Sequence, residues 1–90
     1  MLNRETDPRF IKDLKRYGKK HYDFSKMHAI IDELANDNFI MGKAHNNHAL
    51  VGNWTGYWEL HIEPDVLLIY KRDKENLYLF RLGSHDELFE

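Results

Sequence analysis

The chain has 90 residues, of which 42% are hydrophobic and 31% are charged, and its formal net charge at pH 7 is −2. This length predicts one domain, residues 1–90, and no apolar run reaches the roughly 18 residues that a membrane-spanning helix needs. Because the first residues contain no apolar signal segment, we expect the chain to stay in the cytoplasm. The absence of cysteine excludes disulfides, thiolate metal ligands and a cysteine nucleophile.

The first third of the chain predicts two helices. Asp7 followed by proline is typical of an N-cap and a first helical residue, and the apolar spacing after them predicts a helix that Gly18 ends. A second helix is expected to begin near Asp23 or Ser25 and to end around residues 36–38. Since only a few polar residues join the two helices, we expect them to be antiparallel. The residues before the first helix are compatible with a short edge strand.

From about residue 48 the apolar period changes from helical to two, which predicts antiparallel strands. Residues 57–63 alternate, residues 66–70 are continuously apolar as in a central strand, and residues 77–82 form a third strand. The side chains expected to face the helices are those of Trp58, Leu60, Ile62, Tyr78 and Phe80. The predicted fold class is therefore α+β, with two N-terminal helices packed on a small antiparallel sheet of three to four strands.

Polar side chains of these strands are expected to share one face of the sheet. If the two hairpins turn about Pro64 and Lys74, then His61, Leu67 and Arg81 fall in one row across three strands. This geometry depends on the register, because a slip of one residue would move Arg81 to the other face.

The same hairpins would bring further polar groups to one end of the sheet. Asp65 would lie at the tip of the first hairpin, and His85 would follow the last strand at the same end. Each residue also has a structural interpretation, such as a turn-forming aspartate or a surface ion pair between Arg81 and Glu59 or Glu63. Together, however, imidazoles, a carboxylate and a fixed cation supply what metal-free RNA cleavage requires.

Basic residues are concentrated in the first predicted helix. They are Arg9, Lys12, Lys15, Arg16, Lys19 and Lys20. Such a helix can hold phosphates or an acidic protein partner, and it can also be no more than a solvated face. We name Lys15, Arg16 and Lys19 as candidate RNA contacts.

Several segments resemble the YafQ-type toxins, which belong to the RelE/ParE superfamily of bacterial toxin–antitoxin modules. The most specific are His61-Ile-Glu-Pro-Asp65 and Arg81-Leu-Gly-Ser-His85, in this order, and the resemblance covers nearly the whole chain. The chain departs from the family at Val66, where tryptophan is frequent, and at Trp58, where arginine is frequent.

This resemblance implies a RelE-like fold and an endoribonuclease that enters the ribosomal A site and cuts translated mRNA. It also implies a cognate antitoxin from the same operon, and a toxin–antitoxin complex that binds operator DNA. The implied active-site residues are His48, His61, Asp65, Arg81, His85 and Phe89.

The roles implied for these residues follow the chemistry of 2′-hydroxyl attack on the neighbouring phosphate. His85 and Asp65 are the acid–base candidates, His48 and His61 assist in proton transfer or phosphate contact, and Arg81 stabilises the phosphorane. This reaction needs neither a metal ion nor a cofactor.

Aromatic residues are candidates for stacking on single-stranded RNA. Phe89 is the first candidate, and Trp54 and Tyr57 are further ones. For the latter two, a structural role in the turn between Gly52 and Gly56 is the stronger interpretation. We expect the antitoxin to bind the basic helix around residues 12–20.

Three alternatives remain open from the sequence. A ParE-like toxin would inhibit DNA gyrase by protein contact, although it would not need these histidines and this aspartate. A metal site could use His45 and His48, but no further ligand lies at a suitable spacing. A degenerate toxin would bind its antitoxin without cleaving RNA.

Overall fold

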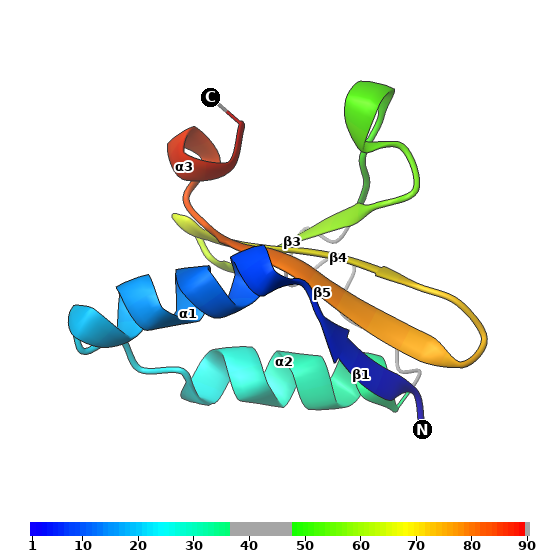
Figure 1. Ribbon diagram of the computed structural model, residues 1–90, viewed down its shortest axis with the longest axis horizontal. Helices are drawn as coiled ribbons and strands as arrows, with labels where there is room; N and C mark the ends of the chain where they lie inside the picture. The colour runs from blue at the N-terminus through cyan, green and yellow to red at the C-terminus, as the bar shows by residue number, and fades with distance from the viewer. Residues whose placement is uncertain (37–47, 90) are drawn as a thin grey trace.

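The computed structural model describes residues 1–36 and 48–89. Its sheet has five strands in the order β1-β5-β4-β3-β2. The strands are β1 (Asn3–Thr6), β2 (His48–Ala49), β3 (Trp58–Glu63), β4 (Val66–Arg72) and β5 (Asn76–Gly83). The helices are α1 (Pro8–Lys19), α2 (Ser25–Ala35) and α3 (His85–Phe89), and a short 3-10 turn, η1, spans Gly52–Trp54. As drawn in Figure 1, α1 and α2 lie below the sheet and α3 lies above it.

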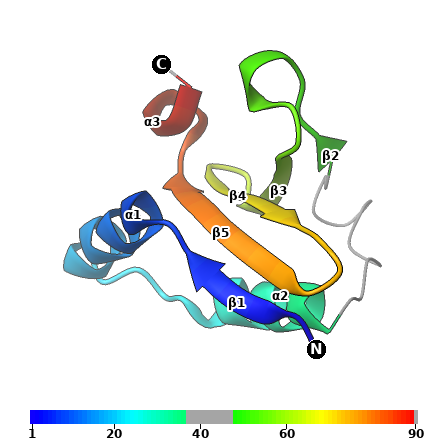
Figure 2. The ribbon, with the colours of Figure 1, turned by 45° about the vertical axis from the view of Figure 1, so that its right-hand side comes forward.

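The predicted α+β class is confirmed, but the details differ. The described residues form five strands rather than three to four, and a third helix follows the last strand. The sheet is not wholly antiparallel, because β1 pairs with β5 in the parallel direction, from Asn3 beside Asn76 to Thr6 beside Leu79. Figure 2 shows β1 lying along β5 at the edge of the sheet. The weakly indicated edge strand is thus present.

The first helix begins as predicted and ends slightly later. The Asp7 carboxylate accepts a hydrogen bond from the Arg9 backbone N–H at 2.8 Å, which satisfies one of the unpaired donors of the first turn. The prediction that Gly18 ends the helix is wrong, since α1 continues to Lys19. The left-handed residue that terminates it is His21, at φ 59°, which its N–H bond to the Gly18 carbonyl holds in place.

The second helix begins at Ser25, as expected. The Asp23 carboxylate accepts the Ser25 backbone N–H at 2.9 Å. The helix ends at Ala35, and the Asn36 N–H caps it on the Asp32 carbonyl at 3.0 Å. The predicted end is around residues 36–38, of which 37 and 38 lie outside the described residues. The chain reverses direction between α1 and α2, as the antiparallel prediction required (Figure 1).

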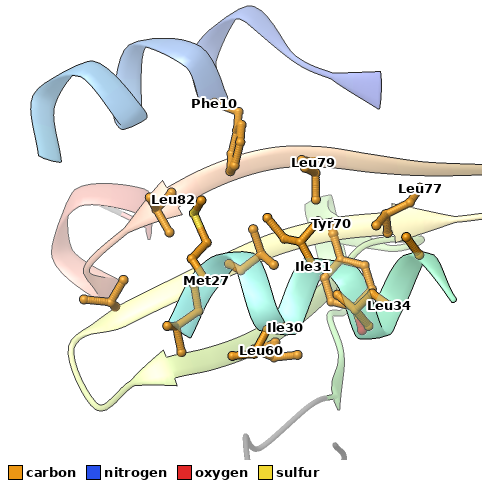
Figure 3. Packing of buried hydrophobic residues seen from close by; sticks show 14 of the residues in the cluster. Phe10, Met27, Ile30, Ile31, Leu34, Leu60, Tyr70, Leu77, Leu79 and Leu82 are labelled. Carbon is orange, nitrogen blue, oxygen red and sulfur yellow. The ribbon is translucent and has the colours of Figure 1, made fainter. Parts of the chain in front are cut away.

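The main core lies between the helices and one face of the sheet (Figure 3). Its buried members include Phe10, Met27, Ile30, Ile31, Leu34, Leu60, Leu68, Tyr70, Leu77, Leu79 and Leu82. A smaller cluster covers the opposite face, where Leu88 of α3 packs on Leu67 and Ile69 of β4. We call the face that carries Leu67 and Ile69 the open face.

A β-bulge in β5 overturns part of the face assignment. Ile69 pairs with Arg81, whereas Tyr70 pairs with Leu79, so Phe80 is an extra residue between the two pairs. The alternation of β5 therefore changes phase at this point. The prediction that Tyr78 and Phe80 face the helices is wrong, because leucines 77 and 79 fill the core instead. Leu82, after the bulge, is in the core.

Truncating the centre of this core should destabilise the domain. Leu68 has 0% exposure, so Leu68→Ala leaves a cavity and should lower the free energy of unfolding by about 2–5 kcal/mol. Val51→Ala, at a position 83% exposed, should change it by no more than about 0.5 kcal/mol. Urea denaturation measures both values. Equal small losses would contradict the assignment of Leu68 to the core.

Candidate active site

Two of the predicted histidines meet at one buried carboxylate. Glu59 of β3 is only 3% exposed, and its partner in the β2–β3 register is His48. The Nε2 atom of His61 lies 3.1 Å from Oε1 of Glu59, and the Nε2 atom of His48 lies 3.6 Å from the same oxygen. An ionised carboxylate can only accept hydrogen bonds, so it orients the imidazole of His61 through an Nε2–H donor. This arrangement holds two imidazoles side by side.

Glu59 is a site residue that the sequence does not predict. From the sequence, this carboxylate is expected only as a possible surface partner of Arg81. The available signal was the alternation that places residues 57, 59, 61 and 63 on one face of the strand. Its burial and its pairing with His48 depend on β2, whose contact with β3 is a tertiary feature.

Arg81 lies on the predicted face but in a different row. The expected pairing of His61 with Leu67 is confirmed, but Leu67 pairs with Gly83, and Arg81 pairs with Ile69. The prediction that His61, Leu67 and Arg81 share one row is therefore wrong. The cause is a wrong hairpin register in β4 and β5, which the bulge also disturbs. Arg81 instead shares a row with Ile69 and Glu59.

The guanidinium of Arg81 is fixed by an acidic residue of α1. Its Nε donates to Oδ2 of Asp13 at 2.8 Å and its Nη2 donates to Oδ1 at 3.2 Å. This two-point contact fixes the plane of the guanidinium as well as its position. Neither Glu59 nor Glu63, the partners considered from the sequence, makes this ion pair.

Asp13 is buried, at 2% exposure, and its carboxylate is fully engaged. Besides Arg81, it accepts the backbone N–H of Leu82 at 2.9 Å and lies 3.2 Å from Nη2 of Arg16. A buried carboxylate without such partners would be strongly unfavourable. Asp13 therefore joins α1 to β5 and positions Arg81.

His85 and Phe89 lie at the two ends of α3. Their ring centroids are 4.9 Å apart, and the Phe89 ring lies 5.4 Å from that of Trp54. Trp54, half-buried in η1, also contacts the Phe80 and Tyr57 rings at 5.7 and 5.8 Å. These three ring contacts favour the structural interpretation of Trp54.

A capping box fixes the beginning of α3. The backbone N–H of Ser84 donates to Oε1 of Glu87 at 2.8 Å, and the N–H of Glu87 donates to Oγ of Ser84 at 3.2 Å. The Tyr17 hydroxyl also donates to Oε1 of Glu87 at 3.0 Å, and Nε of Arg16 lies 3.4 Å from Oε2. Glu87 therefore connects α3 to α1.

These contacts shift two pKa values in the direction that the geometry requires. The Ser84 N–H, together with Tyr17 and Arg16, lowers the pKa of Glu87 below its ordinary value. Burial, and then the bond to Glu87, raises the pKa of Tyr17 to about 12. Tyr17 thus remains a neutral donor and Glu87 a charged acceptor over the physiological range.

Asp65 is exposed in the turn between β3 and β4. Because Leu67 pairs with Gly83, Asp65 and His85 lie at the same end of the sheet, as expected. Figures 1 and 2 both show the β3–β4 turn beside α3. Val66, the residue that follows, is buried in the main core and offers no stacking surface on the open face.

The basic helix divides into exposed and paired residues. Lys15 and Lys19 are exposed. Arg16, by contrast, is engaged with the carboxylates of Asp13 and Glu87. Of the three candidate RNA contacts in α1, the two lysines thus have the greater freedom to meet a ligand.

Residues 1–36 and 48–89 contain no group of three or more potential metal ligands. The alternative metal site used His45, which lies outside the described residues. Among the described helices, none has the length and apolar character to cross a membrane.

The fold and the sequence place the chain among the bacterial toxins of type II toxin–antitoxin systems. The sequence model of YafQ, a toxin of such a system, matches residues 2–90. The chain therefore belongs to the YafQ family, and its enzymatic class is that of an endoribonuclease.

Individual relatives agree with this membership. The mRNA interferase toxin YafQ of Escherichia coli K12 is 35% identical over 85 residues, which are 94% of this chain and 92% of the relative. The crystal structure of YafQ from E. coli BL21(DE3) has a TM-score of 0.92 at 32% identity, covering 100% of both chains. The toxin of the E. coli DinJ–YafQ toxin–antitoxin complex has a TM-score of 0.90 at 34% identity, covering 99% of this chain and 98% of that one.

Removing the charge of Asp13 should destabilise the domain strongly. Asp13→Asn leaves Arg81 without its buried counter-ion, and we expect a loss of about 3–5 kcal/mol in the free energy of unfolding. The matched control is Asp32→Asn, which breaks an exposed ion pair with Arg4 and should cost no more than about 1 kcal/mol. Chemical denaturation compares the two variants. A loss at Asp13 no larger than at Asp32 would refute its anchoring role.

Acid should break the contacts of Glu87 that hold α3 against α1. The folded-state pKa of Glu87 is depressed, so its stabilising contribution is present above the unfolded value of about 4.3 and disappears as the pH falls through the lower folded value. The Ser84 amide resonance, followed by NMR, should titrate with a midpoint below about 4.3. Glu87→Gln should abolish this transition. A midpoint at or above the unfolded value would contradict the proposed contacts.

Proposed function

We propose that this chain is a toxin that cuts translated mRNA in the ribosomal A site without a metal ion and is neutralised by a cognate antitoxin. One observation carries the proposal: His48 and His61 both contact the buried carboxylate of Glu59, and Glu59 lies in the same row of the sheet as Arg81. Membership of the YafQ family supports the substrate class.

The reaction begins with removal of the proton from a ribose 2′-hydroxyl. The resulting oxyanion attacks the neighbouring phosphate, the bond to the 5′ oxygen breaks, and a 2′,3′-cyclic phosphate and a free 5′-hydroxyl result. His85 and Asp65, at the same end of the sheet, act as the acid–base pair. His48 and His61 assist by proton transfer or by contacting the phosphate.

Two buried carboxylates prepare this site electrostatically. Glu59 orients the two strand histidines, and Asp13 holds Arg81 in a fixed position. A preorganised guanidinium stabilises the charge that develops on the phosphorane, because it needs no reorganisation during the reaction. The surface of Phe89 that is not packed on Trp54 stacks on a base beside the cleaved bond.

We infer the binding partners of this chain from its family and from the charge of α1. The E. coli YafQ relative is known in a complex with the antitoxin DinJ, and we infer a comparable protein partner here. The exposed Lys15 and Lys19 make α1 a surface for an acidic antitoxin segment or for ribosomal RNA. The chain acts as one domain in the cytoplasm, and it meets operator DNA only through the antitoxin complex.

Removing either acid–base candidate should abolish toxicity. We expect His85→Ala and Asp65→Ala to eliminate growth arrest on induction. Both side chains are exposed, so their truncation leaves the fold intact, and antitoxin binding at α1 should be unchanged. Asp86→Ala, beside His85 on exposed α3, is the matched control and should remain toxic. Growth curves and co-purification with the antitoxin measure the two properties.

Cell-free translation then identifies the target. Wild-type protein should cut mRNA during translation in the presence of a chelator such as EDTA, with 2′,3′-cyclic phosphate ends. Arrest of growth by both active-site variants at the parental level would refute the assigned chemistry. Inhibition of gyrase supercoiling with intact mRNA would favour the ParE-like alternative instead.

A further inference from the structure

A cavity of about 460 Å³ opens at the junction of β1 and α1. Its lining includes Glu5, Thr6, Tyr57, Lys71, Tyr78 and Phe80. The lining contains neither the acid–base candidates His85 and Asp65 nor the basic residues of α1. Its volume falls in the range of sites that bind small organic groups, and one nucleotide is of this size class.

The cavity belongs to the same face as the histidines. Trp58 pairs with Tyr70, so Tyr57 lies beside Lys71 in the neighbouring row, and Lys71 pairs with Tyr78. The next row on this face contains Glu59 and Arg81. Along β3 and β4 the two rows are two residues apart, which corresponds to about 7 Å. A single RNA strand that contacts the histidines therefore reaches the cavity within one or two nucleotides.

Aromatic rings and the cation of Lys71 line the cavity together, and a second cation, Arg9, lies against one of these rings from outside the lining. The Nζ atom of Lys71 lies 5.3 Å from the ring centroids of both Tyr57 and Tyr78. The guanidinium of Arg9 lies 4.3 Å from the Phe80 ring centroid. Aromatic rings interleaved with cations are the usual means of holding single-stranded nucleic acid, because bases stack on the rings while the cations meet phosphates.

Glu5 adds a means of distinguishing bases. Along β1 the side chains alternate, and Arg4 pairs with Asp32 of α2 on the helix side of the sheet. Glu5 therefore points to the open face, where it lies beside Tyr78. A carboxylate accepts hydrogen bonds only. Guanine offers two adjacent N–H donors, adenine and cytosine offer one amino group beside an acceptor, and uracil places carbonyl oxygens on both sides of its N–H.

We propose that this cavity is a base-binding subsite for the nucleotide that adjoins the cleaved bond of the RNA. The base stacks on the tyrosine rings, Lys71 meets the phosphate, and Glu5 accepts the N–H donors of the base edge. Guanine is the preferred base and uracil the least favoured. This inference rests on the proposed nuclease function and adds a specificity element to it.

NMR titration of the intact protein with single nucleotides tests the subsite directly. Of the four nucleotides, GMP should shift the amide resonances of Glu5, Lys71 and Tyr78 at the lowest nucleotide concentration. UMP should require the highest concentration for the same shifts. Glu5→Gln should reduce the preference for GMP over UMP by about tenfold, since it removes a charged two-point acceptor. Glu75→Gln, at an exposed position in the β4–β5 turn, is the control and should leave the preference unchanged.

Two results would overturn the subsite. One is the absence of shifts at these amides with any of the four nucleotides. The other is a GMP preference that survives Glu5→Gln.

Mapping of cleavage positions during cell-free translation separates this inference from the nuclease proposal. Glu5→Gln should redistribute the cut positions and Lys71→Ala should slow cutting about tenfold, with growth arrest by the Glu75→Gln control unchanged. If the wild type cuts mRNA and the Glu5 and Lys71 variants cut the same positions at the same rates, the subsite is wrong and the nuclease remains. If the wild type cuts no RNA, the nuclease proposal itself fails.

Discussion

The contact between Asp13 and β5 is the interaction on which the rest of the structure depends. β1 pairs with β5 only as far as Leu79, so the second half of β5 would otherwise present an open edge. The Asp13 carboxylate fills this position by accepting the N–H of Leu82, and it holds Arg81 at the same time. One buried acid thus docks α1, protects the sheet edge and positions the cation of the candidate site.

A second buried acid has a comparable role at the other side of the open face. Asp13 and Glu59 are the buried charged residues of the part of the chain that the structure describes, and each holds cationic or protonatable site residues. Burial excludes water from these contacts and strengthens them. The cost in desolvation is offset at Asp13 by Arg81 and the Leu82 N–H, and at Glu59 by the two imidazoles. Stability and preorganisation of the site therefore have the same origin.

The bulge at Phe80 links the fold to the open face. By adding one residue between the pairs of Ile69 and Tyr70, it keeps leucines 77, 79 and 82 in the core while Tyr78 and Phe80 turn outward. The Phe80 ring then contacts Trp54, Tyr57 and the guanidinium of Arg9, and the Tyr78 ring contacts Lys71. The aromatic wall of the proposed subsite is a direct consequence of this irregularity. A regular strand that kept Leu82 in the core would have placed Tyr78 and Phe80 beneath the helices as well.

The sequence by itself determined the class of the fold, both helix starts, the alternation of β3 and the order of the two specific motifs, because these depend on local spacing and capping. Only the tertiary structure decided the register of β5, the parallel pairing of β1 and the burial of Asp13 and Glu59. Those features arise between segments far apart in the chain: Asp13 meets Arg81 across 68 residues, and Glu59 meets His48 only when β2 pairs with β3. Local patterns indicate which face of a strand or helix a residue can occupy. Packing between distant segments determines which residue it contacts and how deeply it is buried, and the periodicity of the sequence does not contain this information.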